Sequence, residues 1–161
     1  MYTKNRFMKT LMWGGVAAAV LTGCNQPSTE DKTAGNNAAD APAATDVKQV
    51  AITAIVEHPA LDAVRQGVIE ELAAEGYEEG KNLKINFQSA QGNTATAGQI
   101  AKQFVGDNPD VIVAIATPSA QSVAAATNSI PIVFSAVTDP VEAKLLKSWD
   151  GSGTNVTGAS D

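Results

Sequence analysis

The sequence predicts an α/β fold built on an open, doubly wound parallel sheet with helices on both faces. Three observations predict it. From residue 47 onward, short apolar runs rich in β-branched residues alternate with segments of helical periodicity. Several of these runs are apolar almost throughout, as in strands that are buried on both faces. Strands that alternate with helices form right-handed crossovers, which make the sheet parallel and cover both of its faces.

Four strands and the beginning of a fifth are expected. The first apolar run covers residues 47–56, and the second, 82–88, alternates apolar with polar side chains. The third run, 110–116, has the strongest β signal of the chain, and a fourth covers 131–137. The glycine-rich run 151–158 predicts a loop that enters one more short strand.

Helical periodicity predicts the connections between these strands. Pro59 suits the first position of a helix and Gly76 its C-terminal cap, and between them lies an apolar stripe of Leu61, Val64, Val68 and Leu72. A second helix is expected near 96–105, and an alanine-rich third helix over 118–128. A short fourth helix is expected from about 140 to 147.

The N-terminal residues predict export. Three basic residues precede a short apolar run, 11–21, and Gly23-Cys24 follows closely. This order is typical of a secretory signal peptide over residues 1–23, and the run is shorter than the roughly 20 residues that span a bilayer. The cut before a cysteine resembles the bacterial lipobox, in which the thiol is lipidated, so Cys24 is expected to carry a lipid anchor. An ordinary signal peptide with an incidental cysteine is the alternative.

Residues 24–46 are expected to form a flexible tether. After Cys24 this segment has no apolar side chain larger than alanine, so it cannot bury enough surface to offset the entropy lost on ordering. The remaining residues, 47–161, have the size of one small domain. A spacer between an anchor and a folded body would let that body work clear of the membrane.

The charge of the chain argues against nucleic acid as a partner. All seventeen acidic residues follow Cys24, together with eight of the eleven basic ones, which gives this part a net charge of −9. Nucleic-acid binding needs a basic face, and attraction to anionic lipid needs basic clusters. Acidity of this kind mainly favours solubility.

Three predicted strands end in the same local pattern, a polar residue followed by a proline. These junctions are His58-Pro59, Thr117-Pro118 and Asp139-Pro140. In a parallel sheet all three lie at the carboxyl edge, where open α/β folds bind ligands. Helix N-termini at that edge present free N–H groups and partial positive charge, which suit a carboxylate.

Each junction also has a purely structural interpretation. Asp139, with Glu142 three residues later, matches a capping box and can serve only as a cap. Thr117 and Ser119 can also be caps, although two hydroxyl groups and several N–H groups at one helix start favour ligand contact. His58, the only histidine, can be a cap or simply solvated.

Signatures of catalysis and of cofactor binding are missing from the sequence. There is no G-x-x-x-x-G-K-[ST], no G-x-G-x-x-G after the first strand, and no G-x-S-x-G. One histidine and one cysteine are too few for a zinc site or for Cys-His catalysis. No enzymatic activity, no cofactor and no metal are therefore expected.

Four segments resemble a known family: EHPALDAVRQGVIEELAAEGYEEGKNLKI, NPDVIVAIATPSAQSVAAAT, IPIVFSAVTDPVEA and GTNVTGASD. They are similar to the substrate-binding lipoproteins of ABC transporters, of the tryptophan- and tyrosine-type group. The resemblance implies a periplasmic-binding-protein-like fold of type I, in which two lobes close over a small ligand and deliver it to a membrane permease. The ligand-binding residues implied for this lobe are His58, Thr117, Pro118, Ser119, Ala120, Thr138 and Asp139.

By this resemblance, residues 47–161 are the N-terminal lobe of an expected two, because chains of the family continue for about one further lobe. The expected function is capture of a small ligand by a protein anchored at the outer face of the cell membrane. The resemblance implies that this ligand is an amino acid, aromatic in character. Two alternatives stay open at this point. One is an exported sensor module coupled to a signalling partner, and the other is a lipid-anchored α/β enzyme.

Overall fold

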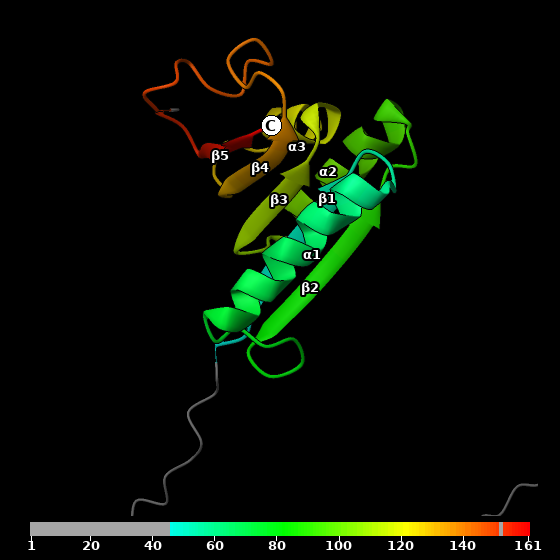
Figure 1. Ribbon diagram of the computed structural model, residues 1–161, viewed down its shortest axis with the longest axis vertical. Helices are drawn as coiled ribbons and strands as arrows, with labels where there is room; N and C mark the ends of the chain where they lie inside the picture. The colour runs from blue at the N-terminus through cyan, green and yellow to red at the C-terminus, as the bar shows by residue number, and fades with distance from the viewer. Residues whose placement is uncertain (1–45, 152) are drawn as a thin grey trace, which may run out of the picture. The chain divides into compact units, whose positions relative to one another are not determined.

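The computed structural model describes residues 46–151 and 153–161. Their sheet has five strands, all parallel, in the order β2-β1-β3-β4-β5. The strands are β1 (Lys48–Ala54), β2 (Leu83–Ser89), β3 (Val111–Ile115), β4 (Ile132–Val137) and β5 (Val156–Ser160). The helices are α1 (Pro59–Ala74), α2 (Thr94–Asp107) and α3 (Thr117–Ala126). Figure 1 shows these elements along the described chain, and the predicted parallel α/β sheet is confirmed.

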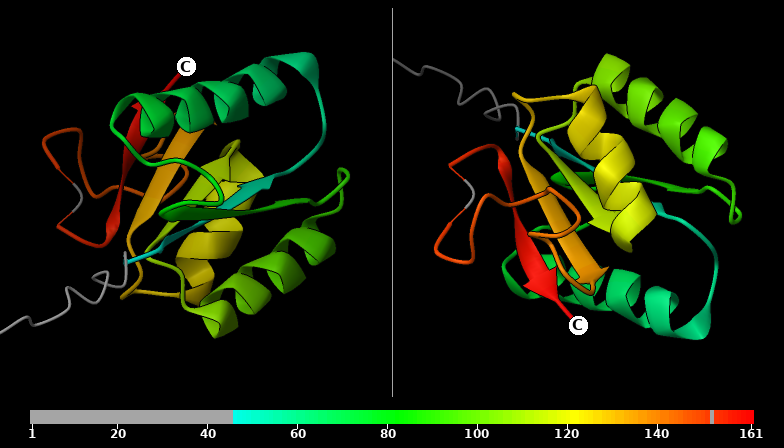
Figure 2. Two further views of the ribbon diagram at one scale, coloured as in Figure 1. Left: turned by 90° about the horizontal axis from the view of Figure 1, so that it is seen from below. Right: turned by 90° about the horizontal axis from the view of Figure 1, so that it is seen from above.

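The helices cover the two faces of the sheet unequally. Figure 2 shows α1 alone on one face and α2 and α3 together on the other. Alternate residues of each strand point to opposite faces. Ile52 and Val113 therefore pack with α1, whereas Ile112 and Phe134 pack with α2 and α3. Full burial of such a side chain contributes about 1.5–3 kcal/mol to stability, so both layers hold the sheet.

Capping groups set the bounds of the first two helices. Gly76 follows the end of α1 with φ 88°, so a left-handed residue stops the helix there, as expected. α2 begins at Thr94, before the expected residue 96, because the Asn93 side chain accepts hydrogen bonds from the amides of Ala95 and Thr96 at 2.8 and 3.1 Å. It ends where Asn108 takes a left-handed conformation with φ 49°.

The helix expected over 140–147 is wrong. The segment makes a single turn, closed by a bond from the Ala143 amide to the Asp139 carbonyl at 2.9 Å. Lys144 then has φ 60°, and the Pro140 carbonyl accepts from Leu145 at 2.9 Å. The left-handed conformation of Lys144 ends the turn. It also reverses the chain so that Ala143 and Leu145, on either side of Lys144, are both buried in the core.

The strand order creates a switch point between β1 and β3. The chain leaves β1 toward β2 on one side and leaves β3 toward β4 on the other, so the two connections diverge. In open α/β sheets a ligand crevice lies outside the carboxyl ends of the strands at this point. Within the part of the chain described, no helix is long and apolar enough to cross a membrane.

Candidate functional site

The carboxyl edge of the sheet carries the three polar-proline junctions that the sequence predicts. One follows β1, one follows β3 and one follows β4. The first two flank the switch point, and the third lies beside the second because β3 and β4 are paired. Ligand contact by these residues remains a prediction, which the geometry below makes specific.

The N-terminus of α3 is free of any side-chain cap. The Ala120 amide donates to the Ala116 carbonyl at 3.1 Å, and Pro118 has no N–H. The amides of Thr117 and Ser119 have no partner within residues 46–151 and 153–161. These two donors, together with the partial positive charge of the helix end, make an uncompensated site for an anion.

A buried hydroxyl group lies in the same helical turn. Ser119 is fully buried, and its Oγ has no hydrogen-bond partner in the described structure. A desolvated hydroxyl without a partner costs about 1–3 kcal/mol, so such a group is informative where it occurs. The beginning of α3 therefore holds two kinds of unsatisfied donor, from the main chain and from a side chain.

Ala116, the residue that joins β3 to α3, has a strained backbone. Its φ of 74° and ψ of 154° fall in a region that is occupied almost only by glycine. The Ala116 amide donates to the Ser135 carbonyl of β4 at 2.9 Å, which fixes this conformation from the neighbouring strand. Strain of this kind costs about 1–3 kcal/mol and gathers at ligand sites. Here it fixes the direction in which α3 leaves the sheet.

Asp139 caps the turn that follows β4. Its Oδ1 accepts hydrogen bonds from the amides of Val141 and Glu142, each at 2.9 Å. Asp139 is therefore a cap, although of a single turn rather than of the expected helix. Both bonds use the same oxygen, so the second carboxylate oxygen is left for another donor.

A hollow of about 290 Å³ brings two of the junctions together. Thr117 lines it from α3, and Thr138 and Asp139 line it from the turn after β4. Gln121 and Glu142 complete the polar wall. The Gln121 side-chain amide donates to the Ala143 carbonyl at 3.1 Å, which holds the turn against α3. The hollow thus has Thr117, the first residue of α3, on one side and the carboxylates of Asp139 and Glu142 on the other.

The remaining predicted residues lie outside this hollow. His58 is exposed, and its Nδ1 accepts from the Ala60 amide at 3.3 Å, so it caps α1. Ala120 is fully buried in the α3 face that meets the sheet. The Pro118 carbonyl accepts from the Ser122 hydroxyl at 2.8 Å. Ser119 is close in sequence to the hollow but does not line it.

Three polar residues near the carboxyl edge were not among the residues expected there from the sequence. Gln121 and Glu142 line the hollow, and Thr53 lies near the end of β1. Gln121 lies four residues after Thr117, so the two share one face of α3, which helical spacing could have indicated. Glu142 was recognised only as part of a capping box. The hydroxyl of Thr53 is buried and unpartnered like that of Ser119, and no local pattern indicates this.

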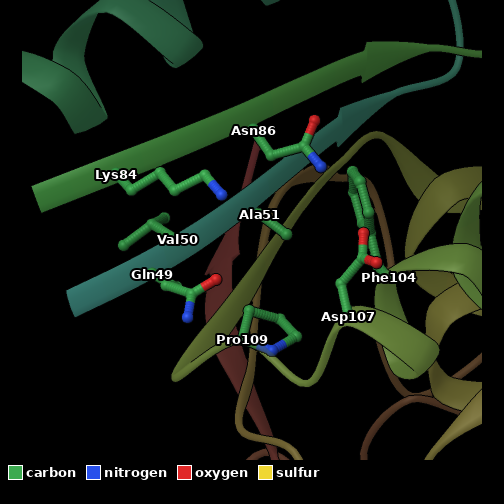
Figure 3. Close-up of a pocket in the computed structure, with 8 residues that line it drawn as sticks. All are labelled: Gln49, Val50, Ala51, Lys84, Asn86, Phe104, Asp107 and Pro109. Carbon is green, nitrogen blue, oxygen red and sulfur yellow. The ribbon is translucent and has the colours of Figure 1, made fainter. Parts of the chain in front are cut away.

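Other hollows of the described residues lie away from the junctions. Figure 3 shows one of about 210 Å³ near the amino ends of β1 and β2, with Lys84 on the strand side and Asp107 on the side of α2. Another, of about 380 Å³, is apolar and lies beside α1, where Val111 and Val133 contribute to its lining. Within the described residues no cluster of histidine, cysteine or acidic side chains could hold a metal ion.

Comparison with known proteins gives matches over most of the chain. A family model for ABC transporter substrate binding proteins matches residues 49–161. A curated relative, a tyrosine-binding protein of Clostridioides difficile (strain R20291), is 43% identical over 164 residues, which cover 100% of this chain and 46% of the relative.

Three solved structures share the fold, and each match covers 71% of this chain and 39% of the solved one. A conserved domain protein of Vibrio cholerae matches with a TM-score of 0.71 and 63% identity. A ligand-free, open substrate-binding protein with adhesive properties from Clostridium difficile gives 0.70 and 50%. An ABC domain of Streptococcus pneumoniae in complex with L-Trp gives 0.69 and 38%.

The chain therefore spans less than half the length of these relatives. The matched family consists of binding proteins rather than enzymes, in agreement with the expectation of no catalytic activity.

Proposed function

Because the chain belongs to the ABC transporter substrate-binding protein family, we propose that residues 47–161 form one lobe of a two-lobed protein that captures an amino acid for an ABC permease. The partial coverage of the relatives supports one lobe of two. Capture is non-covalent, and a second lobe closes over the carboxyl edge of this sheet. The lobe described here supplies the groups that recognise the charged end of the ligand.

The observation that carries the proposal is the hollow between α3 and the turn after β4, where Thr117 at the N-terminal end of α3 lies across from the carboxylates of Asp139 and Glu142. The free amides of Thr117 and Ser119 suit a carboxylate. The second oxygen of Asp139 suits an ammonium group, and Glu142 adds negative charge at the same wall. An α-amino acid carries both groups on one carbon atom, so one small ligand satisfies both walls.

The side chain of the ligand is proposed to be aromatic. Its support is the tyrosine named for the curated relative and the L-Trp bound in the pneumococcal structure. This hollow is mostly polar in its lining residues, so the apolar pocket for the aromatic ring comes largely from the second lobe. His58, Pro118 and Thr138 border the ligand from this lobe, and Ala120 packs beneath it.

Calorimetric titration with the twenty amino acids tests the proposal. The wild-type protein should bind one or a few of them, with aromatic amino acids among these. The Asp139→Asn variant keeps a side chain that can cap but loses the charge. It should weaken binding by about 10-fold or more, since a charge-assisted hydrogen bond contributes about 1.5–3 kcal/mol.

Asp107→Asn is the matched control, because Asp107 is an exposed carboxylate at the opposite edge of the sheet. It should bind as the wild type does. If no amino acid produces heat or a thermal shift in the wild-type protein, the amino-acid assignment is lost. Equal losses of ligand affinity in Asp139→Asn and Asp107→Asn would instead attribute the effect to the net charge of the protein and not to contact with Asp139.

Membership of the family implies an extracytoplasmic location. We propose in addition that Cys24 carries the lipid anchor and that residues 24–46 are its tether, after removal of residues 1–23. These predictions concern residues outside those that the structure describes, and the sequence pattern alone supports them. Labelling of growing cells with a palmitate analogue should mark the wild-type protein and not Cys24→Ala, and label on both would refute the anchor.

A further inference from the structure

Two buried hydroxyl groups remain without hydrogen-bond partners within the described part of the chain. They are Oγ1 of Thr53 and Oγ of Ser119, in residues that are 1% and 0% exposed. Native structures leave few such groups unsatisfied, because each costs about 1–3 kcal/mol. Two in one small sheet layer call for a common explanation.

Both hydroxyl groups belong to the layer between the sheet and the α2/α3 pair. Thr53 shares its strand face with Ala51, which packs in the cluster formed with α2 and α3. Thr53 is in register with Ala114 of β3, and α3 begins three residues after Ala114. Ser119 lies in the first turn of α3, on its buried side. The two hydroxyl groups therefore lie near the carboxyl edge of the same layer, Thr53 on β1 of the sheet and Ser119 on α3, which covers it.

The other buried side chains of this layer cannot supply hydrogen bonds. Near the two hydroxyls the same cluster is rich in alanine, with Ala51, Ala97, Ala101, Ala114 and Ala120. A hydroxyl group can donate one hydrogen bond and accept two, and a buried water molecule makes two to four. One water molecule can thus satisfy both groups where no protein atom does.

We propose that Thr53 is a positioning residue of the ligand site, joined to Ser119 by one buried water molecule. The bridge fixes the first turn of α3 against β1, so that the free amides of Thr117 and Ser119 keep the direction that a ligand carboxylate needs. This inference rests on the proposed function for its binding consequence. The water bridge itself can be tested without any ligand.

A double-mutant cycle in thermal stability tests the bridge. Thr53→Val replaces the hydroxyl by a methyl group of similar shape, and Ser119→Ala removes the other hydroxyl. If the water joins them, Thr53→Val lowers Tm by roughly 4 °C, because one ordinary hydrogen bond is lost from a domain of this size. The double variant then falls no further than the worse single variant, since one shared bridge can be lost only once.

Two results would overturn the bridge. A rise in Tm for Thr53→Val would mean that the hydroxyl is truly unsatisfied, because removal of an unpaired buried polar group stabilises a protein. Additive losses in the double variant would mean that the two hydroxyls act independently.

Titration with L-tyrosine and L-tyrosinamide tests the positioning role. The amide keeps the ammonium and the ring but lacks the negative charge that α3 would bind. Thr53→Val should weaken L-tyrosine binding about fivefold, the equivalent of one hydrogen bond, and leave L-tyrosinamide binding within error. Thr53→Ser keeps the hydroxyl group, so it should bind L-tyrosine and L-tyrosinamide with the same ratio of affinities as the wild type, unlike Thr53→Val.

Equal weakening for both compounds would leave Thr53 a merely structural residue and overturn the positioning role. A wild-type protein that binds neither compound would count against the proposed function. In that case the double-mutant cycle still decides the water bridge, so failure of the inference and failure of the proposed function remain distinguishable.

Discussion

Ala116→Gly should stabilise the protein, although glycine usually destabilises one. Ala116 has φ 74° and ψ 154°, a conformation that costs about 1–3 kcal/mol for a residue with a Cβ atom. Glycine adopts it freely but loses about 0.5–1 kcal/mol through the greater entropy of the unfolded chain. The difference is a net stabilisation of about 0–2.5 kcal/mol, or about 1.25 kcal/mol from the middle of each range.

Calorimetry converts this difference into a measurable shift. Unfolding entropy near 2.1 cal/mol/K per residue gives about 4 °C of Tm per kcal/mol for a domain of roughly 115 residues. Ala116→Gly should therefore raise Tm by about 5 °C, and by at most about 10 °C. Ala63→Gly is the matched control, since Ala63 is exposed in the middle of α1 and glycine there should lower Tm by about 4 °C.

Loss of stability in Ala116→Gly equal to that in Ala63→Gly would refute the strain argument. A urea titration guards against a change in the unfolded state, because the slope m should be the same in both variants and the wild type. Stabilisation combined with weaker ligand binding would fit a strained junction that serves the site.

Three further predictions concern the scaffold. Gly158→Ala should lower the free energy of unfolding in urea by more than about 2 kcal/mol, because the added Cβ atom would clash with the backbone oxygen of Phe134 in β4. Gly67→Ala is the control. An added Cβ atom there meets open space on α1, so this variant should gain about 0.5–1 kcal/mol. Equal effects would contradict the contact. Asn93→Ala removes the cap of α2 and should lower stability by about 1 kcal/mol in the same assay, with Asn93→Asp unaffected, and an unchanged Asn93→Ala would discount the cap. The hydrogen bond and charge of Asp46 raise the pKa of Lys48 above its ordinary value of 10.5. The contribution of this ion pair to the free energy of unfolding is therefore present below pH 10.5 and is lost as the pH rises through the folded-state pKa. The stability difference between wild type and Lys48→Met should therefore narrow in alkali, and a constant difference would contradict the ion pair.

Local sequence patterns predicted the sheet because strands that are buried on both faces consist almost entirely of apolar residues. Strands such as β3 are apolar at nearly every position, and helices such as α1 repeat apolar residues at helical spacing. The prediction of a helix over 140–147 was wrong because tertiary packing decides the conformation there. The turn of this segment is ended by the left-handed Lys144, which lets Leu145 reach the core, and lysine carries no signal for that conformation.

The site was predictable in position but not in detail. A polar residue before proline at a strand end indicates the carboxyl edge whatever the packing. Thr117 and Asp139 do lie there and line one hollow, and their contact with a ligand stays a prediction. The strain at Ala116 and the buried hydroxyl of Thr53 depend on how neighbouring elements pack, and neither residue differs from an ordinary one in the sequence. His58 shows the opposite case, a distinctive residue that the fold uses as a cap.

The place of β1 in the sheet also bears on mechanical load. The described chain enters the sheet at Lys48, and β1 is an inner strand with parallel partners on both sides. A pull on the N-terminal end would act along the strand and shear two ladders of hydrogen bonds together. An edge strand such as β5 has a single neighbour, so the same pull would shear only one ladder. Tension applied at Lys48 would thus enter through an inner strand, at the amino edge of the sheet, opposite the hollow between α3 and the turn after β4.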